Sequence, residues 1–239
     1  MKYENVVSGI FLSRPNRFIA KVLIGGKEEI VHVKNTGRCR ELLTEGSIVY
    51  LSVSDRESRK TKYDLIAVEK KRQNRAPLLV NIDSQIPNGA VMEWLKKGNL
   101  FSENAVVRRE VTYGASRFDF FAEDDERKAF LEVKGVTMEK NGVALFPDAP
   151  TERGIKHLNE LVASLEKGYE AYVIFVIQMK EIFRFSPNDK THLAFGNALR
   201  RASAAGVRIL AYDCVVTTDS IALDAAVEVD LLCSKGEIL

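Results

Sequence analysis

The stretches SRFDFFA (residues 116–122) and AFLEVKGV (residues 129–136) decide how the second half of this chain folds. In both, apolar side chains recur at every second position, which is the pattern of strands with one buried face. The charged run between them predicts a turn, so the segment is expected to form a β-hairpin. A hairpin that is symmetric about residues 125 and 126 places Asp119 opposite Glu132 and Arg117 opposite Lys134.

Two opposed carboxylates need a neutralising partner. Like charges on opposite residues, with Cβ atoms ~5 Å apart, destabilise a strand pair. Mg²⁺ or Mn²⁺ takes oxygen ligands from one or two carboxylates and keeps other positions for water and phosphate oxygens. Asp119 and Glu132 are therefore predicted metal ligands. Lys134 lies two residues along the same face, where an ammonium group can meet a phosphate or an attacking water.

A solvated hairpin face is the alternative, because many such faces carry Asp, Glu and Lys without any chemistry. Two features favour a site. Phe121 and Phe130 lie on the charged face, and Gly135 permits close approach of another backbone segment. A hairpin with Asp on one strand and Glu-x-Lys on the next resembles the PD-(D/E)xK nuclease core.

Length and composition indicate an ordinary globular protein. The chain has 239 residues, 46% hydrophobic and 28% charged, which is enough for two domains. It contains no run of about 18 apolar residues, and its N-terminus lacks the apolar core of a signal peptide. We therefore expect a cytoplasmic protein without a membrane partner. A homodimer is compatible with the sequence, which contains nothing that sets the oligomeric state.

The formal charge of +2 conceals an asymmetry along the chain. Residues 1–80 contain 16 Lys and Arg against 9 Asp and Glu, a balance of +7, whereas residues 81–239 have a balance of −5. A basic excess over a short domain is the electrostatic signature of a protein that binds a phosphate backbone. The alternative is a solvated surface that serves solubility.

The basic third of the chain reads as a small all-β barrel. Five short segments alternate apolar and polar residues or are rich in β-branched ones. A loop at 35–43 leads into one or two expected helical turns, ended by Gly46. This arrangement suits a closed barrel of the OB type. The predicted strands are 6–12, 17–24, 29–34, 47–54 and 63–70.

Two loops of this barrel are predicted to touch nucleic acid. The connection at 55–63 joins the last two strands, a place where OB-folds commonly bind nucleic acid, and the loop at 35–43 carries two further arginines. The predicted contacts are Arg38, Arg40, Arg56, Arg59, Lys60 and Lys62. Aromatic residues of small barrels are more often core, so Phe18, Tyr50 and Tyr63 rank below the cations.

A basic stretch at 70–77, closed by proline, predicts a linker between domains at 1–80 and 81–239. The second domain is expected to be α/β with a mixed sheet. Polar residues near the start of its central helix, Arg153 and His157 among them, lie where anions are favoured and are expected to contact phosphate. The predicted elements are strands at 78–80, 105–113, 171–177 and 207–216 around the hairpin, and helices at 88–97, 151–167 and 191–205.

Longer motifs across nearly the whole chain resemble those of the sugar fermentation stimulation protein A (SfsA) family. They are NTGR (35–38), SRFDF (116–120), EVKGVT (132–137), FPDAPTERG (146–154) and KHLNEL (156–161). The resemblance implies an N-terminal OB-fold, a C-terminal PD-(D/E)xK nuclease-like domain, DNA binding and an association with expression of sugar-utilisation genes. The usual further acid of the nuclease core has two candidates here, Glu93 and Glu110.

The function expected from these features is metal-assisted hydrolysis of a phosphodiester bond. Asp119 and Glu132, with the Val133 carbonyl, would hold Mg²⁺ or Mn²⁺, and Lys134 would orient the attacking water or stabilise transition-state charge. Arg117 joins the expected nucleic-acid contacts. The rival hypothesis is a non-catalytic DNA-binding regulator of sugar-utilisation genes on the same fold, which fold analogy alone does not separate from an enzyme.

Overall fold

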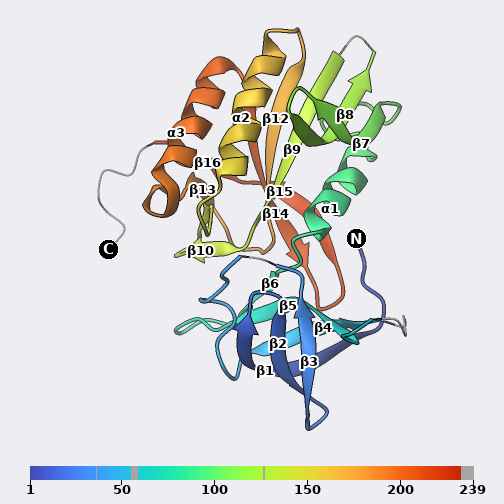
Figure 1. Cartoon of the computed structure of the whole chain (residues 1–239), viewed down its shortest axis with the longest axis vertical. Coiled ribbons are helices and arrows are strands. Elements are labelled where there is room, and N and C mark those ends of the chain that lie inside the picture. The colour runs from blue at the N-terminus through green and yellow to red at the C-terminus, as the bar shows by residue number, and fades with distance from the viewer. Residues whose placement is uncertain (36, 55–58, 126, 233–239) are drawn as a thin grey trace.

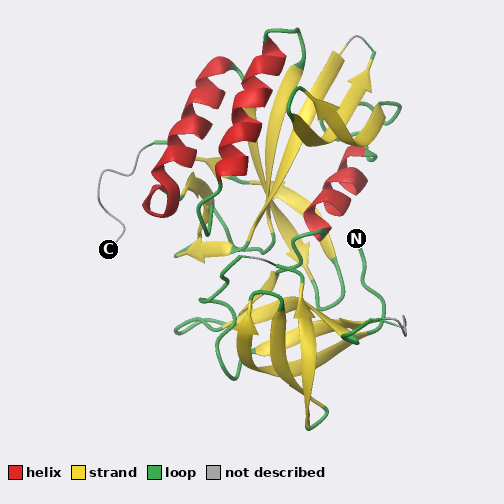
Figure 2. Cartoon of the chain, in the orientation of Figure 1, coloured by secondary structure: helices red, strands yellow, loops and turns green. Residues whose placement is uncertain are grey.

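The computed structural model describes residues 1–35, 37–54, 59–125 and 127–232, which form two domains (Figure 1). The first third of the chain builds an all-β domain, and the rest builds a domain of helices and strands, as the colours of Figure 2 show. No helix among the described residues is long and apolar enough to cross a bilayer.

Five strands of the N-terminal domain form a closed barrel, as predicted. They follow the order β3-β2-β1-β4-β5, and pairing of β3 with β5 closes the barrel. Alternate side chains point inward, so that Val22 of β2 and Val31 of β3 are fully buried. The strands are β1 (Val6–Asn16), β2 (Ile19–Ile24), β3 (Lys27–Val33), β4 (Ile48–Val53) and β5 (Tyr63–Lys70).

Two local expectations for this region are corrected. A sixth strand, β6 (Leu78–Asn81), pairs antiparallel with β5, so the basic stretch before it connects two strands of one sheet and is not an interdomain linker. The expected helical turns after Asn35 are reduced to a turn in which the Leu43 N–H donates to the Cys39 carbonyl. The burial of Cys39 and Leu42 in the barrel core holds this loop in place without a helix.

The C-terminal domain has a mixed main sheet, as predicted, in the order β15-β14-β12-β9-β8-β7. Strand β12 runs parallel to β9 and β14, and the outer pairs are antiparallel. A smaller sheet has the order β10-β11-β13-β16. The strands are β7 (Val106–Tyr113), β8 (Ser116–Asp124), β9 (Arg127–Val136), β10 (Met138–Lys140), β11 (Val143–Phe146), β12 (Glu170–Ile177), β13 (Arg184–Pro187), β14 (Arg208–Val216), β15 (Ile221–Ala226) and β16 (Glu228–Val229).

Helices cover both faces of the main sheet, which explains why β12 is apolar throughout. Val173 and Phe175 belong to the core shared with α2 (Glu152–Leu165) and α3 (Asp189–Ala205). Tyr172 and Ile174 belong to the core shared with α1 (Ile86–Leu95). A strand buried on both sides reads as a continuous hydrophobic run, as this one does.

The predicted start of α2 is confirmed in detail. Thr151 is the N-cap, and its hydroxyl accepts a hydrogen bond from the Gly154 N–H at 3.1 Å. This satisfies one of the free backbone donors of the first turn. After the helix, Gly168 adopts a positive φ of 82°, a conformation that glycine reaches without a steric penalty.

The two domains are joined by hydrogen bonds from several segments. The Asn81 N–H at the end of β6 donates to the Gln178 carbonyl beyond β12, and the Gln178 side chain donates back to Asn81. The Tyr3 N–H donates to the Asp219 carbonyl. The first residues of the chain therefore contact the C-terminal domain before the barrel begins, as the blue segment in Figure 1 shows.

Candidate functional site

The hairpin has the predicted register, but its two strands separate at Asp119. Pairing runs from Asp124 and Arg127 to Phe120 and Leu131 and does not continue to Asp119. Beyond that point the Val133 N–H donates at 2.8 Å to the Asp119 carboxylate. The Asp119 side chain thus takes the place of the backbone hydrogen bonds that were expected between the two strands here.

The separation also changes the faces of β8. Phe118 packs with the α2 core, whereas Phe120 packs with the α1 core, although a regular strand would place both on one side. The predicted strict alternation is therefore broken between them. The predicted turn at 123–128 is shorter as well, because Glu123 and Lys128 pair within the strands.

Glu132 is the centre of the site, with only 3% of its surface exposed. One carboxylate oxygen, Oε1, accepts hydrogen bonds from the Lys134 ammonium and from Nδ1 of His157 on α2. The other oxygen, Oε2, is buried and has no hydrogen-bond partner among the described residues. An unpaired buried carboxylate oxygen is costly unless something outside the protein satisfies it.

His157 is held in one tautomer by its neighbour Arg153. The Arg153 Nε, which can only donate, lies 3.3 Å from Nε2 of His157. The proton of the imidazole is therefore on Nδ1 and is donated to Glu132. His157 orients the Glu132 carboxylate in the way that partners of metal-ligating groups usually do.

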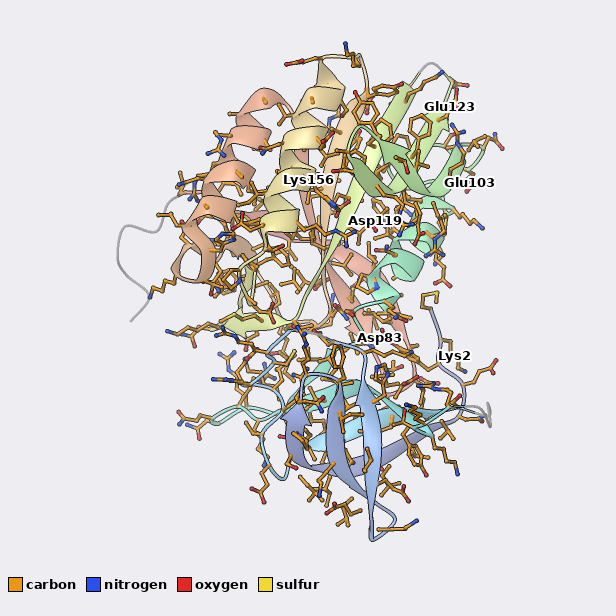
Figure 3. The ribbon with its side chains drawn as sticks, in the orientation of Figure 1. Lys2, Asp83, Glu103, Asp119, Glu123 and Lys156 are labelled. Atoms are coloured by element: carbon orange, nitrogen blue, oxygen red, sulfur yellow. The ribbon has the colours of Figure 1, made fainter. Side chains whose placement is uncertain are left out.

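Asp119 is fixed by two donors from different elements. Its Oδ1 accepts from the side chain of Asn88 on α1 at 2.7 Å, and its Oδ2 accepts from Val133. The site therefore lies between α1 and α2, where Figure 3 shows Asp119 beside the sheet. Both helices contribute a side chain that holds a carboxylate in position.

The two carboxylates differ in their protonation energetics. Burial, reinforced by the negative charge of Glu132, raises the pKa of Asp119 above its usual range. Burial acts on Glu132 in the same direction, but the hydrogen bond with His157 and the charge of Lys134 outweigh it, so the pKa of Glu132 is lowered. The surroundings thus disfavour the charged form of Asp119 and favour the charged form of Glu132.

This contrast predicts opposite effects of neutralising the two residues in metal-free protein. A raised pKa means that Asp119 supports folding when protonated and loses that support as pH rises through its folded pKa. Asp119→Asn lacks this pH dependence, so its denaturation midpoint relative to that of the wild type, with chelator present, should improve as pH rises from 4 to 7. Glu132→Gln should lower the midpoint at pH 7. Urea unfolding curves measure both, with exposed Glu103→Gln as control. A difference between wild type and Asp119→Asn that stays constant from pH 4 to pH 7 would contradict the prediction.

Asp119, Glu132 and the Val133 backbone are the groups that could hold a cation. Within the described part of the chain, no group of three or more His, Cys, Asp or Glu side chains is placed to bind a metal. The donor set is thus two carboxylates with one free oxygen. Such a set suits Mg²⁺, which typically binds one or two carboxylates and fills its other positions with water and phosphate oxygens.

The two candidates for a further acid lie outside the site. Glu93 of α1 pairs with the N-terminal amine of Met1, and Glu110 pairs with exposed Arg117 at 3.4 Å. Asn88 reaches the site in their place. Sequence reasoning missed Asn88 because it read this residue only as the start of a helix, and the one signal available was a polar side chain in the first turn.

The predicted nucleic-acid contacts near the site divide into two kinds. His157 is buried, with 5% of its side chain exposed, and contacts Glu132 in place of solvent. Arg153 and Arg117 are exposed. The three therefore do not form one surface, since His157 is buried against the Glu132 carboxylate and only the two arginines are exposed.

The cations predicted on the barrel differ in availability. Arg59 donates to Asp64 through both terminal nitrogens, one bond being 2.8 Å long. Lys60, Lys62, Arg38 and Arg40 are exposed. The remaining candidate, Arg56, lies outside the described residues. Hence the 54–62 connection offers fewer free cations than its composition suggests.

The fold and the site define a class of two-domain proteins. In this class a closed OB barrel is joined to a mixed-sheet α/β domain that carries a buried carboxylate–lysine site. Residues 12–82 match the family model described as the SfsA N-terminal OB domain. Residues 85–220 match the model described as the sugar fermentation stimulation protein RE domain. The chain belongs to the SfsA family.

Relatives and a solved structure agree with this assignment over nearly the full length. The chain is 61% identical over 232 residues to a sugar fermentation stimulation protein homolog of Desulfitobacterium hafniense, covering 97% of this chain and 99% of the relative. It is 54% identical over 231 residues to that of Ruminiclostridium cellulolyticum, covering 97% and 100%. The structure of Pyrococcus furiosus SfsA in complex with Ca²⁺ superposes with a TM-score of 0.83 at 27% identity, covering 96% and 98%.

Proposed function

We propose that this chain binds nucleic acid, DNA in the first instance, and hydrolyses phosphodiester bonds with the help of Mg²⁺ or Mn²⁺ in a PD-(D/E)xK-type site. The observation that carries the proposal is the bare, buried Oε2 of Glu132 beside Asp119. All other hydrogen-bonding atoms of the two carboxylates are engaged by protein donors. A divalent cation would neutralise both charges and satisfy the free oxygen.

The residues of the site have separate tasks in this proposal. Asp119, Glu132 and the Val133 carbonyl hold the cation, which when bound polarises the phosphate and lowers the pKa of a coordinated water. His157 and Asn88 keep the two carboxylates in position. Lys134 places a positive charge beside the reacting phosphate, where it stabilises charge that develops in the transition state.

Two further observations support the proposal. The solved relative from Pyrococcus furiosus was described in complex with Ca²⁺, a hard cation that takes oxygen ligands as Mg²⁺ does. The barrel domain carries the basic excess of the chain, which suits a long polyanion. The C-terminal domain would thus hold the cation and the reacting phosphate, and the barrel would bind the rest of the nucleic-acid backbone.

The second candidate is a non-catalytic DNA-binding regulator of sugar-utilisation genes. The family description, sugar fermentation stimulation, is the observation in its favour. On this hypothesis the carboxylates would serve structure or ligand contact only.

Incubation with end-labelled single- and double-stranded DNA and RNA distinguishes the two candidates. We expect cleavage with Mg²⁺ or Mn²⁺ and none with chelator, because the cation supplies both the water activation and the charge neutralisation. The cation concentration is set high enough that the unfolding temperature no longer rises with added cation. If the protein then binds one of the four polymers but cleaves none of them, the result would favour the regulator.

A further inference from the structure

An arginine-lined hollow lies on the barrel at the loop 35–43, one of the two loops predicted to touch nucleic acid. It has a volume of about 400 Å³ and lies between the β1–β2 turn and the loop after β3. Its lining contains no acidic side chain. We call it the arginine hollow, defined by Arg14, Asn16, Arg17, Gly37, Arg38, Cys39, Arg40 and Leu43.

Arg14 builds the hollow and is not free to bind a ligand through its terminal nitrogens. Its guanidinium donates to the backbone carbonyls of Asn35, Gly37 and Arg38, and to that of Arg17 across the hollow. These four bonds tie the loop to the turn. The hollow is therefore shaped before any ligand arrives, which lowers the entropic cost of binding.

The other three arginines remain available. Arg17, Arg38 and Arg40 are exposed, and none forms an ion pair with a carboxylate in the described part of the chain. Between Arg38 and Arg40, Cys39 is buried in the barrel core with a φ of 43°, so the backbone turns sharply while both neighbours face solvent. Three exposed guanidinium groups around a hollow whose lining holds no acidic side chain suit a phosphate.

An aromatic side chain stands at the edge of the hollow. Phe18 is 46% exposed, and the Arg17 guanidinium lies 5.1 Å from its ring centroid. The Asn16 side chain accepts hydrogen bonds from the backbone N–H groups of Phe18 and Ile19, at 2.9 and 3.1 Å, which fixes the turn that presents the ring. Tyr50, by contrast, is half-buried and donates to Glu69.

We propose that the arginine hollow and Phe18 form a subsite for single-stranded nucleic acid, with one base stacked on Phe18 and a neighbouring phosphate held by Arg17, Arg38 and Arg40. Stacking on an aromatic ring needs a base whose face is open, which a single strand offers and an intact duplex does not. The inference deepens the proposed function by naming its substrate class, and it rests on that function only for the cleavage step.

The subsite is anchored to the domain that carries the carboxylates. The Arg38 N–H donates at 3.1 Å to the Asp148 carboxylate, which precedes α2. At the adjacent Gly37, a Cβ atom would collide with the same carboxylate, so the loop needs glycine to approach this closely. A strand bound in the hollow is thereby held against the C-terminal domain.

Fluorescence anisotropy with a labelled oligothymidine and a labelled duplex of equal length tests the subsite, with chelator present so that no cleavage occurs. The variant Arg17→Ala/Arg38→Ala/Arg40→Ala should weaken single-strand binding and reduce the slope of log affinity against log salt by about 0.7, since one phosphate contact is lost. Lys167→Ala/Lys190→Ala/Arg201→Ala removes the same charge from exposed positions of the other domain and should leave the slope unchanged.

Phe18→Ala tests stacking separately from charge. We expect single-strand affinity to fall about 5- to 150-fold with an unchanged salt slope, because stacking of one base is lost and no phosphate contact is. The matched control is Phe183→Ala, since Phe183 is 58% exposed and also has an arginine, Arg184, over its ring at 5.9 Å. Duplex binding should change little in either variant.

Several outcomes would overturn the inference. If Phe18→Ala binds the single strand as tightly as the wild type does, no base stacks on Phe18. The same conclusion follows if the variant loses as much affinity for the duplex as for the single strand. A loss in Lys60→Ala/Lys62→Ala with none in the arginine variant would place the contact on the 54–62 connection. Because binding is measured without cation, the expected binding results together with no cleavage would retain the subsite and reject the hydrolytic function.

Discussion

Glu132→Gln is expected to abolish both the stabilisation by divalent cations and any metal-dependent cleavage. Wild-type protein should gain ~2.7 kcal/mol at a hundredfold excess of cation over its dissociation constant, through preferential binding to the native state. The variant removes the charge of the site carboxylate whose buried Oε2 has no hydrogen-bond partner among the described residues. Thermal unfolding with Mn²⁺, Mg²⁺ or Ca²⁺ measures the gain, and Asp119→Asn should lose most of it as well.

The control for this prediction is Glu103→Gln, which neutralises an exposed carboxylate on the α1–β7 connection (Figure 3). It should retain the full response to cation. An unchanged response in Glu132→Gln would remove Glu132 from the cation site. Absence of any response in the wild type would instead favour the non-catalytic regulator.

Lys134→Met is expected to separate cation binding from chemistry. Cleavage should fall about 10²- to 10³-fold, the usual loss when one preorganised donor to the transition state is removed. Cation affinity should stay the same or rise, because the ammonium that shares Glu132 Oε1 no longer opposes a second positive charge nearby. Methionine keeps the length of the lysine stem and so limits the loss of packing.

Single-turnover cleavage rates, measured at cation concentrations that saturate each variant, check this prediction. The comparison with His157→Phe is informative, since His157 donates to the Glu132 carboxylate and acts as a positioning residue. That variant should lose about 10- to 100-fold in cation affinity. Equal losses of affinity in both variants would mean that Lys134 serves only to hold Glu132.

Local sequence patterns determined the elements of this protein and its chemistry-bearing residues. Alternation predicted the hairpin and its register as far as Phe120, because side-chain period and turn symmetry are local properties. The continuous apolar run predicted a strand buried on both faces, and Thr151 predicted the start of α2. Spacing along two strands also predicted Asp119, Glu132 and Lys134 as one site, and the structure places these three side chains together.

The tertiary structure alone decided which partner each polar side chain has. The break between Phe118 and Phe120 arises because the two rings enter different cores, one under α2 and one under α1. Asn88 meets Asp119 across 31 residues, a contact that no local pattern contains.

Partners that are distant in the sequence also decide which side chains of the barrel are paired and which are exposed. Arg59 and Arg40 look equivalent in the sequence, yet Asp64 pairs with the first and leaves the second exposed. Phe18 was expected in the core by composition and lies at the surface because the Asn16 turn directs it outward. Burial and pairing depend on residues far apart in the chain, and only the folded protein brings those residues together.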